Sequence, residues 1–149
     1  MTYEERNNLV AILTNILVMG WLTARLLGMN GEGAFGGPDG LAVWAQTVLW
    51  VIPASVGVTI IATILFNILF AIATRDENPS FIIDERDRQI AIRGMVTTMI
   101  VASAGFIGAL IALAFGWTAL LALTVILYGF AAGDLIGSIV KLVLWRRGA

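Results

Sequence analysis

The sequence predicts an all-α fold, an integral membrane four-helix bundle that forms a single transmembrane domain over residues 1–149. The composition predicts the membrane setting, because 59% of the residues are hydrophobic, 13% are charged and the mean hydropathy is +0.92. Four apolar segments each exceed the ~18 residues that indicate a membrane-spanning helix. At about 20 to 25 residues per crossing, a chain of 149 residues has no room for a separate soluble domain.

The first two helices are predicted at about residues 7–29 and 41–74. The second segment is too long for a straight crossing, because its 34 residues would span about 51 Å as a helix against a hydrocarbon core of ~30 Å. Pro53 provides a bend, since it has no N–H to donate to the carbonyl of Leu49 and its ring clashes there. We therefore expect a kink near Ile52, with residues 41–50 tilted or lying at the membrane surface.

The third and fourth helices are predicted at residues 84–115 and 117–145. Residues 115–117 leave room only for a tight turn, so these helices should form a tight antiparallel hairpin. Because the turn is centred on Gly116, residues whose numbers sum to about 232 should lie at similar depth. The fourth helix carries a ladder of small residues that permits close approach of another helix: Gly129, Gly133 and Gly137.

The basic residues predict the orientation of the chain. Most of them flank the two ends of the chain or the loop between the second and third helices: Arg6, Arg75, Arg86, Arg88, Arg93, Lys141, Arg146 and Arg147. Only Arg25 falls on the other side. By the positive-inside rule, we expect a multi-pass protein of the cell inner (cytoplasmic) membrane with both termini and the loop 75–89 in the cytoplasm.

Several function classes are disfavoured by composition. The chain contains neither His nor Cys, which removes imidazole bases, thiol nucleophiles, disulfides and the usual ligands of zinc, copper and haem. We therefore predict no enzyme activity, no catalytic residues, no metal site and no cofactor. The formal net charge of −1 provides no basic surface for direct binding of nucleic acid.

Asp134 is the one acidic residue within the fourth apolar segment, where a carboxylate costs roughly 2.5 to 3.5 kcal/mol to insert. The depth rule places it level with Thr98, and helix ends estimated from the charges place Asn15 and Asn67 at nearly the same depth. Four helices would thus contribute one polar layer. Two interpretations stay open: a protonatable or cation-binding site used in transport, or a structural carboxyl group held neutral or paired to Lys141 or Arg93.

The loop 75–93 is the second concentration of charge, and its candidate partner-binding residues are Asp84, Glu85, Arg86, Asp87, Arg88 and Arg93. Asp84 is a good N-cap, and Asp87 would lie in the first turn of the third helix. Two interpretations again remain, a capped and solvated helix start or a recognition surface for a cytosolic protein. The expected partners are membrane lipid, a protein of a membrane complex or a cytosolic regulator, and a second copy of the chain.

The string Asp84-Glu85-Arg86-Asp87, followed by Ile90 and leading into the third helix, resembles the signature of a family of small uncharacterised prokaryotic four-helix membrane proteins known only as a domain of unknown function. The resemblance implies the four-helix architecture and no established chemistry. It also implies a link to compact helix-turn-helix regulators, which some similar proteins are thought to hold at the membrane.

Together these features predict a non-enzymatic interaction or accessory protein of the membrane that binds its partner through the loop 75–93. The alternative is a small ion- or proton-coupled transporter or channel that uses Asp134.

Overall fold

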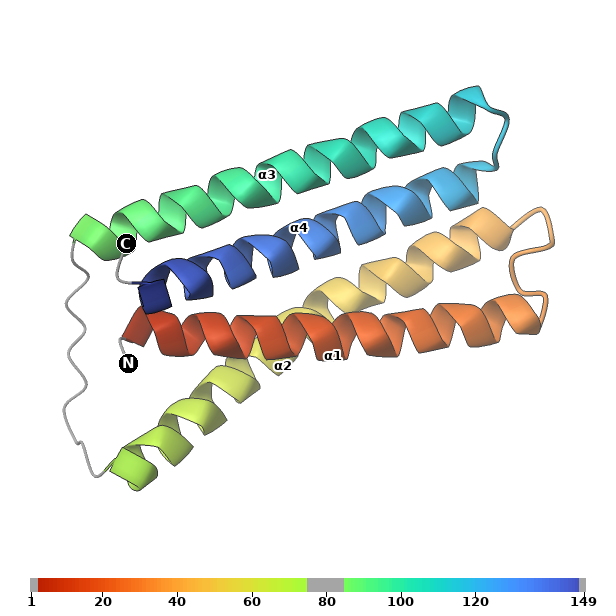
Figure 1. Ribbon diagram of the computed structural model, residues 1–149. Coiled ribbons are helices and arrows are strands. Elements are labelled where there is room, and N and C mark those ends of the chain that lie inside the picture. Colours follow the sequence, from red (N-terminus) through yellow and green to blue (C-terminus); the bar gives the residue numbers. More distant parts are fainter. Residues whose placement is uncertain (1–2, 75–84, 148–149) are drawn as a thin grey trace.

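The computed structural model describes residues 3–74 and 85–147, which form four long helices. These helices are α1 (Tyr3–Gly31), α2 (Gly40–Thr74), α3 (Glu85–Ala114) and α4 (Ala119–Arg147). All four are long and apolar enough to cross a membrane, so the predicted all-α membrane fold is confirmed. Figure 1 shows that both termini lie at one end of the molecule, called here the terminal end; the opposite end, where α1 joins α2 and α3 joins α4, is the turn end.

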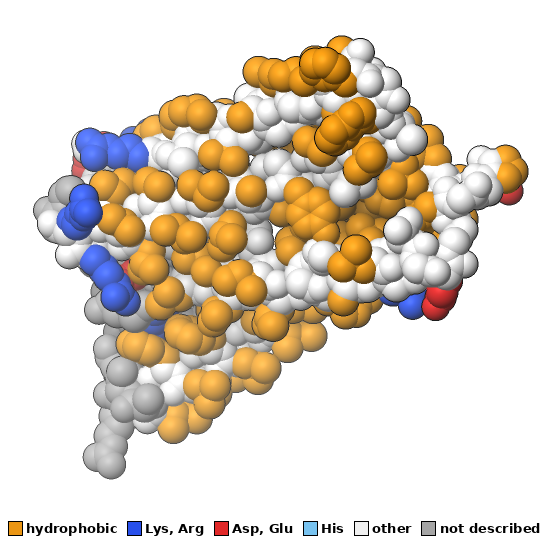
Figure 2. Space-filling model, turned by 45° about the vertical axis from the view of Figure 1, so that its right-hand side comes forward, with side chains coloured by type: hydrophobic (Ala, Val, Ile, Leu, Met, Phe, Trp, Pro, Cys, Tyr) orange, Lys and Arg blue, Asp and Glu red, His pale blue; other side chains and the backbone are white. Residues whose placement is uncertain are grey.

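The surface of the molecule is that of a protein surrounded by lipid. Large aliphatic side chains are exposed along every helix, and Figure 2 shows them spread over the whole visible face. Lys and Arg side chains gather instead at the terminal end (Figure 2). Such a surface would be unstable in water, whereas the apolar interior of a bilayer covers it at no cost.

Two helices begin two or more residues away from the predicted start, for local electrostatic and hydrogen-bonding reasons. Helix α1 begins at Tyr3, earlier than residue 7, with Glu4 and Glu5 in its first turn, where acidic side chains interact favourably with the helix dipole. Helix α4 begins at Ala119, because the Thr118 hydroxyl oxygen accepts a hydrogen bond from the backbone N–H of Leu121 at 3.3 Å and caps the helix. The predicted N-cap of α3, Asp84, lies outside the described residues.

A four-residue connection, residues 115–118, joins α3 to α4 and sets their antiparallel register. Gly116 has a φ of 80°, a left-handed conformation that suits glycine. The backbone N–H of Gly116 donates to the carbonyl of Leu113 at 2.9 Å, and that of Trp117 donates to Ala112 at 3.0 Å, which satisfies carbonyls left open at the helix end. The predicted tight hairpin is confirmed.

Helices α3 and α4 pack closely because glycine removes the side chains from their contact. A Cβ atom added to Gly105 would lie 2.7 Å from the Cα atom of Gly129, and one added to Gly133 would lie 2.7 Å from the carbonyl oxygen of Thr98. Gly137 meets the carbonyl oxygen of Gly94 in the same way. The predicted glycine ladder of α4 therefore faces α3, and the backbones of the two helices touch directly.

Helices α1 and α2 meet mainly toward the turn end. Leu22 and Leu26 of α1 pack there against Trp44 and Val51 of α2, and all four side chains are buried. These four residues form the principal apolar core of the described part of the chain. The contact fixes the first half of α2 against the bundle.

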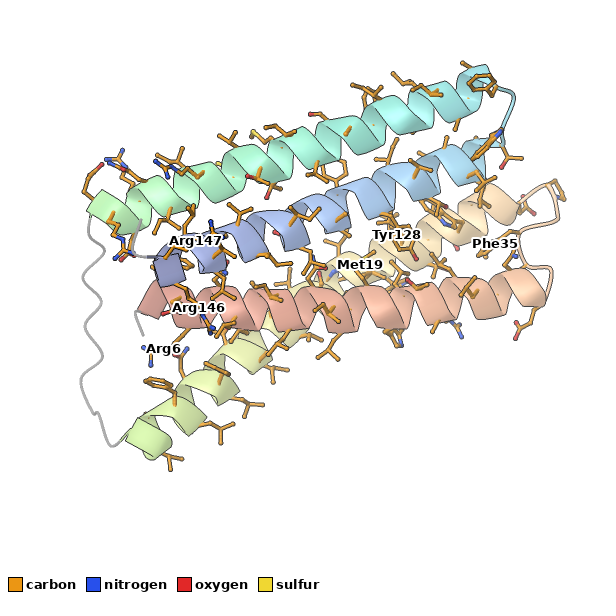
Figure 3. All side chains as sticks on the ribbon, in the orientation of Figure 1. Arg6, Met19, Phe35, Tyr128, Arg146 and Arg147 are labelled. Carbon is orange, nitrogen blue, oxygen red and sulfur yellow. The ribbon has the colours of Figure 1, made fainter. Side chains whose placement is uncertain are left out.

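The second half of α2 leaves the bundle. Helix α2 continues through Pro53, and beyond its crossing with α1 it points away from α3 and α4 (Figure 1). It contacts α1 again near the terminal end, where the guanidinium carbon of Arg6 lies 4.3 Å from the centre of the Phe70 ring. Figure 3 shows Arg6 reaching from α1 toward this end of α2.

The close contact between α3 and α4 predicts that a methyl group added at Gly133 lowers the stability of the protein, whereas one added outside the contact does not. We expect Gly133→Ala to destabilise the protein by about 1–3 kcal/mol, because its Cβ atom would meet backbone and the two helices would have to separate. The measurement is the free energy of unfolding in detergent micelles, followed by circular dichroism.

Gly20→Ala is the matched control, since no heavy atom lies within 4 Å of a Cβ atom built there. This variant should unfold like the wild type or at slightly higher temperature, because alanine favours helix. Equal stability of Gly133→Ala and Gly20→Ala would contradict the direct backbone contact.

Candidate functional site

Asp134 of α4 is hydrogen-bonded to Asn15 of α1. The Asn15 Nδ2 atom donates to Asp134 Oδ2 at 2.9 Å and lies 3.3 Å from the carbonyl oxygen of Ala131, one turn earlier on α4. The amide thus uses both of its N–H bonds on α4. A hydrogen bond to a carboxylate is stronger than one between neutral groups, so this contact ties α1 to α4 near the middle of both helices.

Two further hydrogen bonds hold α1 against α4. Toward the terminal end, Asn8 Nδ2 donates to the carbonyl oxygen of Ser138 at 2.7 Å. Toward the turn end, the hydroxyl oxygens of Thr23 and Tyr128 lie 2.5 Å apart, with Tyr128 directed into the space beside α1 (Figure 3). Asn8, Asn15 and Thr23 follow one another at steps of seven and eight residues, which places them on one face of α1.

The Asp134 carboxylate opens onto a cavity of about 450 Å³ between α1, α2 and α4. The polar lining consists of Thr14, Asn15, Ser55, Thr59 and Asp134. The other ten lining residues are apolar and include Met19, Leu22 and Phe130. Ser55 and Thr59 are spaced by four residues and so share one face of α2, but nothing in the sequence shows that this face meets α1 and α4 at Asp134.

Asp134 is exposed to this cavity, and Asn15 is its one side-chain partner among the described residues. Lys141, one of the two cations expected to pair with Asp134, instead packs its aliphatic stem against Gly94 of α3. Arg93, the other, is exposed on α3. Neither cation pairs with Asp134 in the described structure, since Lys141 packs against α3 and Arg93 lies on α3. Of the structural interpretation, the paired form is therefore not supported.

Thr98 lies at the predicted depth, beside Gly133 of α4, but the four polar side chains of the expected layer do not all meet. Asn67 Nδ2 donates to the carbonyl of Thr63 on its own helix at 2.9 Å, because the second half of α2 has left the bundle. The Thr98 hydroxyl donates to the carbonyl of Gly94 at 3.2 Å, on the face of α3 that meets the α4 glycines. The structure thus brings Asn15 and Asp134 together and leaves Asn67 and Thr98 elsewhere.

The charged residues at the start of α3 include some that face the bundle and others that face outward. Asp87 is buried, and its Oδ1 atom accepts a hydrogen bond from Trp145 Nε1 at 2.8 Å. Arg86 donates to the carbonyl of Trp145 at 3.2 Å. Among the other candidate partner-binding residues, Glu85, Arg88 and Arg93 are exposed, while Asp84 lies outside the described residues.

The contact between Asp87 and Trp145 was missed by sequence reasoning, although a signal for it was present. Their numbers sum to 232, so the hairpin rule already places them at the same depth. The position of Trp145 near the end of α4 is typical of a tryptophan at the membrane interface. Its indole N–H instead satisfies a buried carboxylate and joins the two ends of the hairpin.

Two other cavities differ from the one at Asp134 because no charged residue lines them. A cavity of about 590 Å³ at the turn end is lined by residues of α1, α2, α4 and the first connection, Trp44 and Tyr128 among them, and none of its lining residues is charged. A smaller one of about 280 Å³ between α1 and α2 has an entirely apolar lining. In residues 3–74 and 85–147, no group of three or more acidic side chains is placed to hold a metal ion.

Comparison of the chain with protein-family models, curated proteins and solved structures found no match. The resemblance carried by residues 84–87 and 90 therefore stays a prediction.

The hydrogen bond between Trp145 and Asp87 predicts a specific role for one of the five tryptophans. Trp145→Phe should lower the stability by about 1–3 kcal/mol, because a buried carboxylate loses a donor while the aromatic ring is kept. The measurement is the midpoint of thermal unfolding in detergent.

Trp50→Phe is the control, because Trp50 is 76% exposed and its ring faces away from the other helices. Its unfolding midpoint should match that of the wild type. A Trp145→Phe protein as stable as Trp50→Phe would show that the indole N–H contributes nothing to the hairpin.

Proposed function

We propose that this protein is a non-enzymatic integral membrane protein that binds a cation or a proton at Asp134, as a small ion- or proton-coupled transporter or channel does. The observation that carries the proposal is the Asp134 carboxylate, which opens onto the cavity between α1, α2 and α4 and has no Lys or Arg partner among the described residues. A negative charge at this position is costly in a membrane unless a cation or a proton neutralises it.

The position of Asp134 on α4 supports this role. It lies fifteen residues after Ala119 and thirteen before Arg147, so it is close to the middle of the helix. A helical rise of 1.5 Å per residue puts it about 20 Å from either end. A charged group at that depth is by default a candidate for binding or transport.

The hydrogen bond from Asn15 couples the binding of a cation or a proton at Asp134 to the contact between α1 and α4. An ionised carboxylate accepts the amide N–H strongly, whereas a protonated or cation-bound one accepts it more weakly. Binding of a cation or a proton at Asp134 therefore weakens the contact of α1 with α4 at this point. The Asn8 and Thr23 contacts keep the two helices together above and below it.

We also propose that the terminal end faces the cytoplasm of a prokaryotic cell and that the membrane is the inner membrane. Support comes from the positive-inside rule, because the basic side chains of the described chain gather at the terminal end (Figure 2), and Arg25 is the exception.

The transport proposal predicts the outcome of one isosteric substitution. Asp134→Asn keeps the size of the side chain and an acceptor oxygen for Asn15 but removes the charge. Proton or sodium flux into proteoliposomes should fall to the level of empty vesicles. Unchanged circular dichroism and size-exclusion profiles would show that the fold is retained.

Glu32→Gln is the matched control, because Glu32 is an exposed acid in the connection between α1 and α2. Its flux should equal that of the wild type. Equal flux through wild type and Asp134→Asn would remove the basis of the proposal.

A second function is supported by a different observation. Asp87 holds the start of α3 in place while its neighbours Glu85, Arg88 and Arg93 face outward. We propose that these exposed charges bind a protein partner, either a member of a membrane complex or a cytosolic regulator. In that case the protein acts as an accessory protein of the membrane.

The accessory role predicts that the double variant Arg88→Ala/Arg93→Ala loses a partner that copurifies with the wild type from native membranes. The two side chains are exposed, so the fold should be unaffected. Label-free mass spectrometry of the purified complexes measures the loss. Arg147→Ala changes an exposed charge at the same end and should keep the partner; identical protein profiles for all three would argue against this role.

A further inference from the structure

We propose that the cavity at Asp134 takes an amphipathic organic cation, with the positively charged head at the carboxylate and an apolar body along α1, α2 and α4. This inference rests on the proposed function and goes one step further, because it names the chemical class of the ligand. It follows from the distribution of charge and apolar surface within the cavity.

The charge of the cavity requires a cationic head. Asp134 is the one charged residue in the lining. Its Oδ2 atom accepts the hydrogen bond from Asn15, whereas Oδ1 has no hydrogen-bond donor among the described residues. A positively charged group beside Oδ1 completes the site and neutralises a carboxylate that lies about 20 Å from the helix ends.

The walls of the cavity require an apolar body. Ten of the fifteen lining residues are apolar, and the volume of about 450 Å³ lies in the range of sites for small organic molecules. Phe130 lies one turn before Asp134 on α4 and lines the same cavity. Spaced by four residues, the two side chains share one face of the helix, so an ammonium or phosphonium group can contact the carboxylate and the aromatic ring together.

The polar groups are unsuited to a divalent metal ion. Calcium takes six to eight oxygen ligands and magnesium about six. Asn15 turns its N–H groups, and not its oxygen, toward Asp134, while the Ser55 and Thr59 hydroxyls donate to carbonyls of their own helix at 2.8 Å. One carboxylate among apolar side chains suits a large cation of low charge density better.

The depth of the site favours a free cation over a lipid headgroup. Asp134 lies thirteen residues before the end of α4, which is about 20 Å along the helix. The ammonium groups of lipids lie at the membrane surface, so a headgroup would have to sink into the hydrocarbon to reach the carboxylate.

The test is equilibrium binding of radiolabelled tetraphenylphosphonium to the purified full-length protein in detergent. We expect saturable binding to the wild type and a loss of at least about tenfold in affinity for Asp134→Asn, since the variant has no charge for the cation. Phe130→Ala should bind about fivefold more weakly, because it loses the ring but keeps the carboxylate. Phe106→Ala, which removes a similarly exposed ring from α3 outside the cavity, should bind like the wild type.

Tetraphenylborate and tetramethylammonium separate the contributions of charge and apolar body. Tetraphenylborate has nearly the same shape with the opposite charge, and tetramethylammonium has the same charge with little apolar surface. Both should bind far more weakly than tetraphenylphosphonium. Equal binding of the phosphonium and the borate, or equal binding of the phosphonium to wild type and Asp134→Asn, would overturn the inference.

The failure of this inference can be told from the failure of the proposed function. If tetraphenylphosphonium does not bind but proton or sodium flux still depends on Asp134, the ligand class is wrong and the cation-binding role stands. If neither the binding nor the flux depends on Asp134, both are wrong.

Discussion

Helix association in a membrane cannot draw on the hydrophobic effect, because lipid tails are as apolar as the side chains they would replace. Helices must therefore approach closely or share hydrogen bonds, and α4 does both on different faces. Its glycines bring it against the backbone of α3, while Asp134 and the carbonyl groups of Ala131 and Ser138 receive amides from α1. These two contacts position α3 and α1, whereas the first half of α2 is held by its apolar contact with α1 at Leu22 and Trp44. Helix α2 makes few close backbone contacts and few hydrogen bonds with the other helices, which explains why half of it stands apart from the bundle.

The two faces of α4 differ in how much space they leave between α4 and the neighbouring helix. The contact with α3 consists of backbone against backbone, leaving no space for a ligand or a water molecule. The contact with α1 is made by polar side chains at intervals of about two turns, and the space between α1, α2 and α4 is open. A rigid hairpin thus carries the carboxylate, and a less tightly packed pair of helices forms the opposite walls. Because of this arrangement, the walls formed by α1 and α2 can move without displacing Asp134, which the hairpin of α3 and α4 holds in place.

The hairpin was predictable from the sequence because a very short connection sets the register of the helices it joins. The same rule correctly implies the meeting of Gly133 with Thr98 and of Asp87 with Trp145. The arrangement of α1 and α2 was not predictable in this way, since the longer connection at residues 32–39 leaves rotation and tilt open. Membrane helices are also apolar on all sides, so no amphipathic face shows which residues point inward. Asn67 was therefore assigned to a polar layer that its helix does not reach, whereas Asn15 was assigned correctly to the vicinity of Asp134.

The short connection at Gly116 also bears on how the protein enters the membrane during synthesis. We expect helices joined this closely to insert together as one hairpin, so that α4 need not cross the bilayer as an isolated segment. Asn15 precedes Asp134 by 119 residues, so its helix is synthesised well before the carboxylate emerges from the ribosome. The chain thus produces the acceptor only after its donor is available. An order of helices with α4 first would expose the same carboxylate to lipid before any partner existed.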